Sequence, residues 1–336
     1  MAGGPLAFTE VEVLVRAAEG HALSKRSSLA DLRRWLTDQG RQGQESLSAQ
    51  LDLIAFRRRP WAGLALDRPR IMGVLNVTPD SFSDGGNFLD PARAIEQGRA
   101  LLTAGAEIID IGGESTRPRA APVSPEEEIR RVEPVVKALA EAGAMVSIDT
   151  RHASVMATAL ERGARIINDV SALTGDPASL SVAARYNAAV VLMHMAGDPR
   201  TMQEAPRYDD PVLDVLDFLE ARIASCLAAG LPREALVVDP GIGFGKNDRH
   251  NRALLSRVAV FHGTGCGVAL GASRKSFIGR LGGGGAPKQR LGGSLAVALW
   301  AAGAGVQILR VHDVAETRQA LMIREAIVSG AALTEF

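Results

Sequence analysis

Eight short apolar runs along the chain each end on a polar or charged residue, always at the C-terminal side of the run. They cover residues 70–77, 106–114, 145–150, 165–170, 189–194, 235–240, 267–275 and 306–312. Burial in a core requires only the apolar part of such a run. The repeated polar ending therefore predicts eight strands whose ends share one face, where the chemistry is done.

The spacing of these runs predicts a (β/α)8 barrel, also called a TIM barrel. Asn76 near the end of the first run and His312 at the end of the last are 236 residues apart, about 34 residues for each of the seven intervals. Such an interval accommodates a strand, a helix and two loops, and the total suits a barrel of roughly 250 residues. Asp90 before Pro91 predicts a helix start between the first two runs, and Gly105 predicts its end.

A doubly wound open sheet also alternates strands and helices, and it is the alternative fold. It would place a glycine-rich turn after its first strand, whereas residues 76–86 read NVTPDSFSDGG. The later GIGFGK at residues 241–246 matches neither nucleotide-binding fingerprint, because its glycines are spaced GxGxG and Asn247 follows Lys246. We therefore expect a barrel over residues 67–336.

Residues 1–66 precede the first run as a short N-terminal extension. Amphipathic helical patterns follow Ser28 and begin again at Glu45, so we expect the extension to be mainly helical. It is either packed on the barrel or an interaction arm, and packing is the simpler alternative.

Composition favours small-molecule chemistry. The 38 basic and 38 acidic residues give no net charge that would attract nucleic acid or a membrane surface. Cys226 and Cys266 show no metal-ligand or disulfide spacing. The sequence has no signal peptide and no apolar stretch of membrane-spanning length, so we expect a cytoplasmic protein.

The polar endings should be neighbours at the C-terminal mouth of the barrel. They are Asn76, Asp110, Glu114, Asp149, Asn168, His194, Asp239, Lys275, Arg310 and His312. Among them, Asp149, Asn168 and Asp239 combine carboxylate acceptors with an amide, which suits a flat heterocycle with an amino-pyrimidinone edge. The alternative is that each caps a helix or braces the barrel.

Cations form a second group at this mouth. Arg117, Lys275, Arg310 and His312 come from the loop after the second run and from the last two runs, and the latter form the usual phosphate-binding corner of this fold. Arginine and lysine suit a phosphate or pyrophosphate, although a lone cation is more often solvated. Asn76 offers an oxygen ligand to Mg²⁺.

Two loops, residues 79–88 and 115–120, combine glycine or proline with hydroxyls and charge, as expected of lids over an anion. Met193, Met195 and Phe244 are apolar residues near the strand ends. They either fill the core or stack on a ligand.

Eight segments resemble, in order, the successive signatures of the dihydropteroate synthase family from about residue 68 to the C-terminal end. They read IMGVLNVTPDSFSDGG, DIGGESTRP, SIDT, INDVSAL, VLMHM, DPGIGFGK, GASRKSFIG and RVHDV. The resemblance implies a pterin-binding barrel that joins 6-hydroxymethyl-7,8-dihydropterin pyrophosphate to 4-aminobenzoate in folate synthesis, with Mg²⁺ as cofactor. It also suggests a homodimer, for which the alanine-rich segment 294–305 is the candidate contact.

The resemblance assigns the site residues by substrate. The pterin would be held by Asp149, Asn168, Met193, Asp239 and Lys275; the pyrophosphate by Thr116, Arg117, Arg310 and His312; the aminobenzoate by Thr116, Arg117, Pro118, Phe244, Ser273 and Lys275; and Mg²⁺ by Asn76. Asp149, Lys275 and Arg310 would be catalytic. Arg119 stands where the family commonly has glycine, so the loop after the second run departs from the pattern.

Two rival functions share this fold. A methyltetrahydrofolate-dependent methyltransferase has a similar pterin-binding barrel, but it needs no pyrophosphate corner. A non-catalytic paralogue would keep the pterin pocket without turnover, and Arg119 is the feature that favours it. Sulfonamide susceptibility is left open by the sequence.

Overall fold

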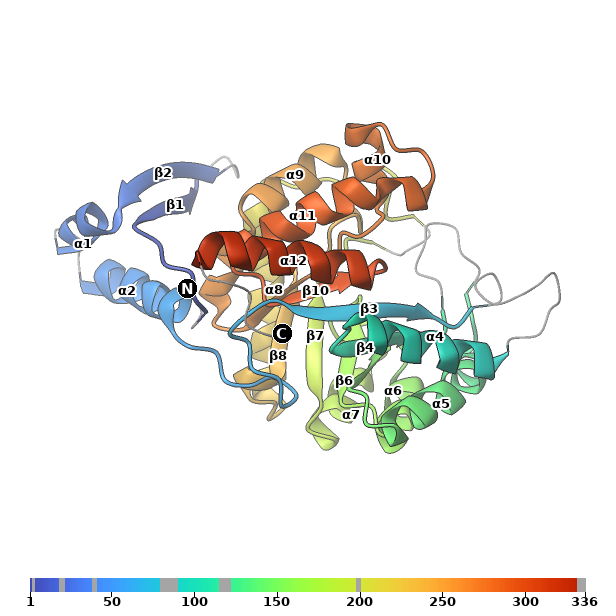
Figure 1. Cartoon of the computed structure of the whole chain (residues 1–336). Coiled ribbons are helices and arrows are strands. Elements are labelled where there is room, and N and C mark those ends of the chain that lie inside the picture. Colours follow the sequence, from blue (N-terminus) through green and yellow to red (C-terminus); the bar gives the residue numbers. More distant parts are fainter. Residues whose placement is uncertain are drawn as a thin grey trace.

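The computed structural model describes residues 1, 4–17, 22–37, 41–78, 90–114, 122–197 and 201–330, and its centre is a closed barrel of eight parallel strands (Figure 1). The strands are β3 Arg70–Asn76, β4 Ile108–Gly112, β5 Val146–Asp149, β6 Ile166–Asp169, β7 Ala189–Met193, β8 Leu236–Asp239, β9 Gly267–Leu270 and β10 Ile308–Val311. The last strand pairs with the first, which closes the sheet. The predicted (β/α)8 barrel is confirmed, and the open doubly wound sheet is excluded.

Helices follow the strands and surround the barrel (Figure 1). They are α4 Pro91–Ala104, α5 Pro125–Glu141, α6 Ala153–Glu161, α7 Ser179–Arg185, α8 Pro211–Ala228, α9 Asp248–Ser256, α10 Ser276–Gly282, α11 Leu291–Gly303 and α12 Val314–Ser329, with short 3-10 helices η1 Arg233–Ala235, η2 Val258–Thr264 and η3 Pro287–Arg290. The predicted cap of α4 is present, since the Asp90 carboxylate accepts from the Ala92 N–H at 2.9 Å and Gly105 has φ of 106°.

Apolar side chains fill two regions. The larger lies between the strands and the surrounding helices. The smaller region fills the interior of the barrel at the N-terminal end of the strands. Ile108, Ile166 and Ile308, the first residues of β4, β6 and β10, lie there, and Trp61 packs with them at zero exposure. The Trp61 indole N–H donates to the Ala235 carbonyl at 3.0 Å. Because this end is closed by packing, the opposite, C-terminal end of the strands is left for polar chemistry.

The N-terminal extension contains a hairpin as well as helices. Strands β1 Glu10–Arg16 and β2 Ala22–Ser28 pair antiparallel, followed by α1 Leu29–Thr37 and α2 Arg41–Ala55. Both helices were predicted, and the hairpin was not, because β2 reads ALSKRSS and lacks an apolar alternation.

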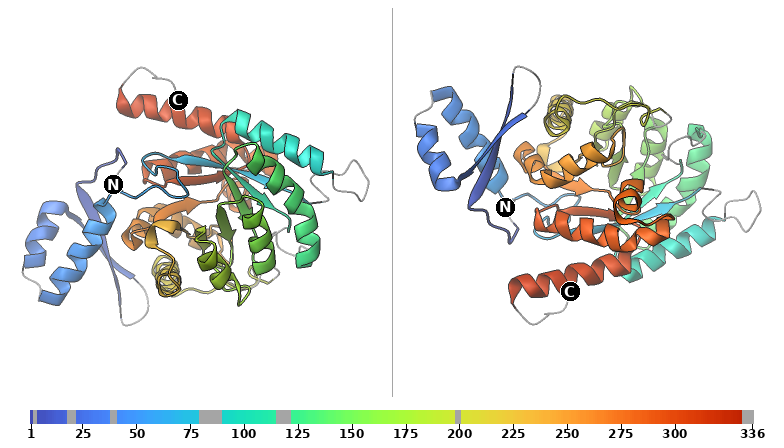
Figure 2. Two further views of the ribbon diagram at one scale, coloured as in Figure 1. Left: turned by 90° about the horizontal axis from the view of Figure 1, so that it is seen from below. Right: turned by 90° about the horizontal axis from the view of Figure 1, so that it is seen from above.

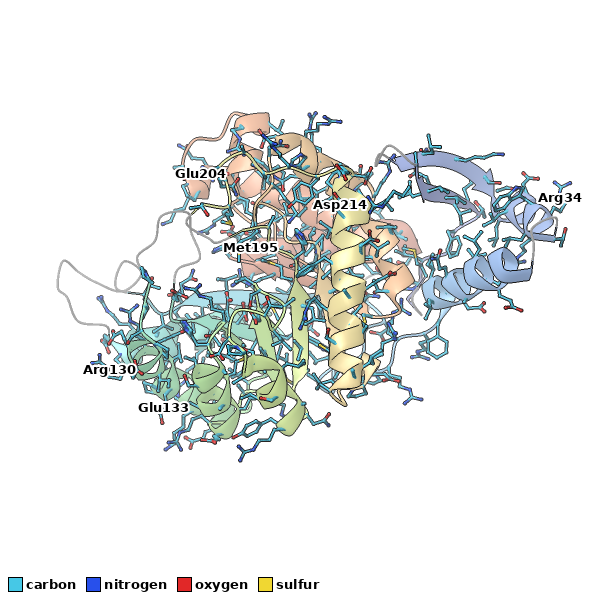
Figure 3. All side chains as sticks on the ribbon, turned by 180° about the vertical axis from the view of Figure 1, so that it is seen from behind. Arg34, Arg130, Glu133, Met195, Glu204 and Asp214 are labelled. Atoms are coloured by element: carbon cyan, nitrogen blue, oxygen red, sulfur yellow. The ribbon has the colours of Figure 1, made fainter. Side chains whose placement is uncertain are left out.

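Contacts join the extension to one side of the barrel, and both views in Figure 2 show it there. Arg16 pairs with Asp214 at 2.8 Å and Asp217 at 2.6 Å on α8, and Asp214 lies on the part of α8 nearest the hairpin in Figure 3. The buried Arg58 guanidinium donates to the carbonyls of His262 and Cys266 at 2.8 and 2.9 Å. These contacts favour a packed addition over a free arm. Among the described residues, no helix is both long and apolar enough to cross a membrane.

Candidate active site

A fully buried carboxylate, Asp110 on β4, lies at the centre of the polar cluster inside the strand ends. Its Oδ1 accepts from the Ser147 hydroxyl at 2.6 Å. Its Oδ2 accepts from Asn168 Nδ2 at 3.0 Å and from Arg310 Nε at 2.6 Å. Asp110 therefore orients two predicted site residues, Asn168 and Arg310. The sequence marked it as a polar strand ending but assigned it no role.

Arg310 also reaches Asp149. Its Nη2 donates to Asp149 Oδ2 at 2.6 Å, so one guanidinium bridges two carboxylates. Burial raises the pKa of Asp149 to about 7, and the Arg310 charge opposes that rise. The structure thus groups Arg310 with the carboxylates of the predicted pterin pocket, whereas the sequence grouped it with the phosphate cations.

Asp239 and Lys275 form the other side of this pocket. Asp239 Oδ1 accepts from the Gly241 N–H at 2.7 Å, and the Lys275 amine donates to the Ile242 carbonyl. Burial lowers the pKa of Lys275 to about 7, and the nearby Asp239 carboxylate opposes that shift. Burial likewise raises the pKa of Asp239, which Lys275 opposes. The two groups therefore stabilise each other's charge in a site with little water.

Two glycines lie beside these carboxylates. A Cβ atom at Gly112 would lie 3.7 Å from Asp149 Oδ2, and one at Gly271 would lie 3.8 Å from Asp239 Oδ2. Met193, 5% exposed at the end of β7, pairs in register with Asp239. The mouth of the barrel is thus polar at these carboxylates and apolar at Met193.

Residues 273–275 form a turn that presents two predicted residues to the mouth. Arg274 has φ of 60°, an unusual value for a side chain other than glycine, and its Nε pairs with Asp313 Oδ2 at 2.9 Å. The neighbouring Ser273 hydroxyl lies 3.1 Å from His312 Nδ1. The Arg274 ion pair therefore joins the loops after β9 and β10. No sequence pattern marks this pair, because its two residues are 39 positions apart.

Phe244 lies beside Lys275, with the Lys275 amine 4.3 Å from the centre of the ring. Asn76 ends β3, half-buried and paired in register with Gly112. The other predicted contacts, Thr116, Arg117 and Pro118, lie outside the described residues, as do Arg119 and the predicted lid at 79–88.

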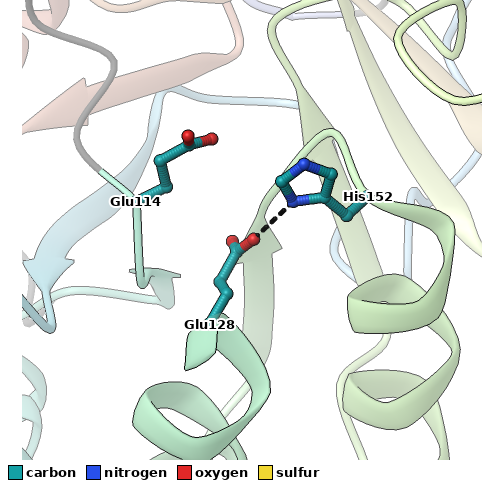
Figure 4. Close-up of side chains that lie close together, drawn as sticks. All are labelled: Glu114, Glu128 and His152. Carbon is teal, nitrogen blue, oxygen red and sulfur yellow. Dashed lines mark hydrogen bonds and ion pairs between the residues drawn. The ribbon is translucent and has the colours of Figure 1, made fainter. Parts of the chain in front are cut away.

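A second group of possible metal ligands comes from the loop after β4, the first turn of α5 and the loop after β5. Ligand atoms of Glu114, Glu128 and His152 are within 4.8 Å of one another (Figure 4). His152 Nδ1 lies 2.8 Å from Glu128 Oε2, and Arg151 Nε donates to Glu114 Oε2 at 3.1 Å. The spacing is compatible with a metal ion. The Arg151 guanidinium, however, already neutralises the Glu114 carboxylate and would repel a metal cation.

Comparison with known proteins identifies the family. The sequence profile of a family described as "Pterin binding enzyme" matches residues 72–312. The dihydropteroate synthase of Escherichia coli K12 is 49% identical over 267 residues, which is 79% of this chain and 94% of that protein.

Solved structures agree with this match. The Yersinia pestis dihydropteroate synthase in a sulfonamide drug complex has a TM-score of 0.76 and 46% identity, covering 81% of this chain and 99% of its own. The Xanthomonas albilineans enzyme with 4-aminobenzoic acid has the same TM-score and identity, covering 81% and 98%. With this fold, this polar mouth and relatives nearly half identical over most of both lengths, the chain belongs to the dihydropteroate synthase family of pterin-binding enzymes.

Proposed function

We propose that this chain is a dihydropteroate synthase, which condenses 6-hydroxymethyl-7,8-dihydropterin pyrophosphate with 4-aminobenzoate to give 7,8-dihydropteroate and pyrophosphate. The observation that carries this proposal is that Asp149, Asn168 and Asp239 at the ends of β5, β6 and β8, and Lys275 in the loop after β9, meet at the C-terminal mouth of a family barrel. A related structure from Xanthomonas albilineans was solved with 7,8-dihydropteroate.

The hydrogen-bonding groups of the pocket match the edge of a pterin. Asp149 and Asp239 accept from ring and amino N–H groups when ionised. Asn168 gives its Nδ2 to Asp110, which leaves its carbonyl oxygen for the ligand. Lys275 supplies a donor for the ring carbonyl, and Met193 packs on the ring face.

The aminobenzoate would lie against Phe244, Ser273 and Lys275. The segment after β4 would complete its site with Thr116, Arg117 and Pro118. This assignment rests on the family resemblance and on the proximity of Phe244 to Lys275. The Yersinia pestis relative was solved in a sulfonamide drug complex, so we expect sulfonamides to compete at the same place.

The pyrophosphate would lie toward Arg117, Arg310 and His312. The described residues fit Mg²⁺ at Asn76, which ends β3 half-buried at the mouth and offers an amide oxygen, a hard ligand. When bound, Mg²⁺ would supply positive charge to the leaving pyrophosphate.

The reaction breaks the bond between the pterin methylene carbon and the pyrophosphate oxygen, and forms a bond from that carbon to the amine nitrogen of 4-aminobenzoate, which then loses one proton. Negative charge grows on the departing oxygen and positive charge on the methylene, next to Asp149. Side chains therefore act by orientation and by fixed charge, and no side-chain nucleophile is required.

Incubation of the purified protein with both substrates and Mg²⁺ tests the proposal. We expect pyrophosphate and dihydropteroate in equal amounts, and Lys275→Ala should abolish both. A protein that binds the pterin but releases no pyrophosphate would instead be the non-catalytic paralogue. Methyl transfer from methyltetrahydrofolate would identify the other rival.

We also propose a homodimer. Large apolar side chains remain exposed on the last two helices: Trp300 at 56% on α11, and Ile323, Ile327 and Val328 at 52, 75 and 58% on α12. Ile323 and Ile327 are one turn apart and share a face of α12, and an exposed apolar face commonly marks an association surface. Sedimentation of the wild type should give twice the monomer mass, and Ile327→Asp should give the monomer.

A further inference from the structure

Lys246 is a lysine buried at the mouth of the barrel, with 1% of its surface exposed. Its amine lies 2.9 Å from His194 Nδ1, and it donates to the carbonyls of His194 at 3.2 Å and Phe244 at 2.9 Å. Among the described residues, Lys246 forms no salt bridge, and the charges of Lys275 and Asp239 act on its amine with opposite effects. Burial of an amine is costly unless it is hydrogen-bonded, and these bonds to His194 and Phe244 offset that cost.

The two chain segments that the amine joins both belong to the mouth. His194 directly follows Met193 at the end of β7, and Phe244 lies in the loop after β8. This loop runs close to β7, since a Cβ atom at Gly241 would lie 1.9 Å from the His194 carbonyl oxygen. The backbone of Gly241 therefore contacts that of His194 directly. Lys246, at the far end of the same loop, hydrogen-bonds to His194 as well.

Other bonds secure the loop between these points. Gly243 donates its N–H to Asn251 Oδ1 at 2.8 Å, and its carbonyl accepts from Gln203 Nε2 at 2.6 Å. The Tyr208 hydroxyl donates to the Gly245 carbonyl at 2.8 Å. At the inner side, Lys275 donates to the Ile242 carbonyl. Lys275 and Lys246 thus hold the loop from the pocket side and from the buried side.

The side chain placed by this arrangement is Phe244. Its ring faces the Lys275 amine, while its own carbonyl is the acceptor of Lys246. We propose that Lys246 is a positioning residue that, through His194 and the Phe244 backbone, sets the place of the Phe244 ring and hence the aminobenzoate subsite. This inference rests on the proposed function.

The charge state of the pair is consistent with a purely geometric role. Burial lowers the pKa of His194 to about 3, so its ring is neutral at physiological pH. Burial also lowers the pKa of Lys246, and the Lys275 charge adds to that shift. In either protonation state the amine can donate to both carbonyls.

Lys246→Met tests the inference because methionine matches the aliphatic stem of lysine and lacks its terminal amine. Loss of the bond that fixes Phe244 should raise KM for 4-aminobenzoate about tenfold, while KM for the pterin pyrophosphate changes by less than about threefold. Tyr208→Phe removes a neighbouring anchor of the same loop and should raise the aminobenzoate KM by a smaller factor. Lys137→Met, at an exposed lysine on α5, is the matched control and should change neither constant.

The outcomes separate this inference from its alternatives. An equal rise of both KM values, or a fall in melting temperature with both KM values unchanged, would make Lys246 a structural residue and overturn the proposal. If Lys246→Met does not fold, Tyr208→Phe decides, and an unchanged aminobenzoate KM in that folded variant overturns it. A wild type without turnover would count against the proposed function itself, whereas an active wild type with an unaffected Lys246→Met would overturn only this inference.

Discussion

Arg310 on β10 and Asp110 on β4 are 200 residues apart in the chain and are joined by a hydrogen bond of 2.6 Å between Nε and Oδ2. Strand β3 lies between their strands in the barrel. Because the same guanidinium also bonds Asp149, one cation balances two carboxylates at the base of the pocket. Arg310 therefore neutralises buried carboxylates, a role separate from the contact with pyrophosphate that we propose for it.

Replacement of Arg310 by methionine should lower stability as well as activity. Removing one partner of a buried ion pair costs about 3–5 kcal/mol. In the variant, Asp149 loses the Arg310 charge that holds its folded-state pKa down, so this pKa rises further above the unfolded value. Protonation of Asp149 then stabilises the folded variant, and the loss of stability should be smaller at pH 6 than at pH 8. Urea unfolding at both pH values measures this. Arg68→Met, at a pair with 44% exposure of the arginine, is the control and should cost about 1 kcal/mol or less. An equal loss at both pH values would argue against the paired carboxylates.

Pterin affinity should depend on the ionisation of Asp149. Its pKa is about 7 and the ionised form accepts the ligand's N–H groups, so affinity should fall as the pH drops below about 7. Titration of the pterin substrate from pH 5.5 to 8.5, monitored by fluorescence, gives the profile. Asp149→Asn should bind more weakly at neutral pH and should lose the acidic limb. Persistence of that limb in the variant would assign it to another group.

Lys275 should produce the alkaline limb of kcat/KM. The pKa of its amine is lowered to about 7, so its charge is lost as the pH rises through that value. Together with Asp149, this predicts a narrow bell-shaped profile with a maximum near neutrality. Lys275→Arg keeps the charge at all these pH values, so any residual activity should show no alkaline fall. A wild-type rate that stays constant up to pH 9 would contradict this assignment.

Activity should require a divalent cation that binds near Asn76. Removal of metal by EDTA should stop pyrophosphate release, and Mg²⁺ should restore it. Asn76→Ala removes one oxygen ligand and should raise the Mg²⁺ concentration needed for half activity about tenfold. Glu128→Gln tests the other candidate metal site, formed by Glu114, Glu128 and His152. If that variant raises the Mg²⁺ requirement and Asn76→Ala does not, the cation lies at the cluster.

Gly241 should not tolerate a side chain. Its φ is 68°, and a Cβ atom would lie 1.9 Å from the His194 carbonyl oxygen, so Gly241→Ala should cost at least about 2 kcal/mol and weaken substrate binding. Gly143 has a similar φ of 86°, but nothing lies within 4 Å of its Cβ position. Gly143→Ala should therefore cost only about 1 kcal/mol and leave kinetics unchanged. Thermal unfolding of both variants separates the close contact from the backbone strain.

Local pattern was sufficient for most of the architecture. The apolar runs ending at Asn76, Asp149 and Asp239 predicted strands, and Asp90 and Gly105 predicted the limits of α4, because periodicity and capping depend on residues close in sequence. Parallel pairing then places the strand ends at one mouth, so much of the site could be predicted as a set. The hairpin in the extension was missed because its second strand is polar on both faces.

The pairing within that set was decided only by tertiary structure. In the sequence, Asp110 is one polar strand ending among ten, and Lys246 belongs to a glycine-rich segment that matches no nucleotide-binding fingerprint. In the structure, each of them hydrogen-bonds to residues that follow or belong to other strands. The sequence by itself determined which residues reach the mouth, since strand alternation is local. Which carboxylate takes which cation depends on barrel closure and on burial, and these bring groups up to 200 residues apart into contact where little water competes for their hydrogen bonds.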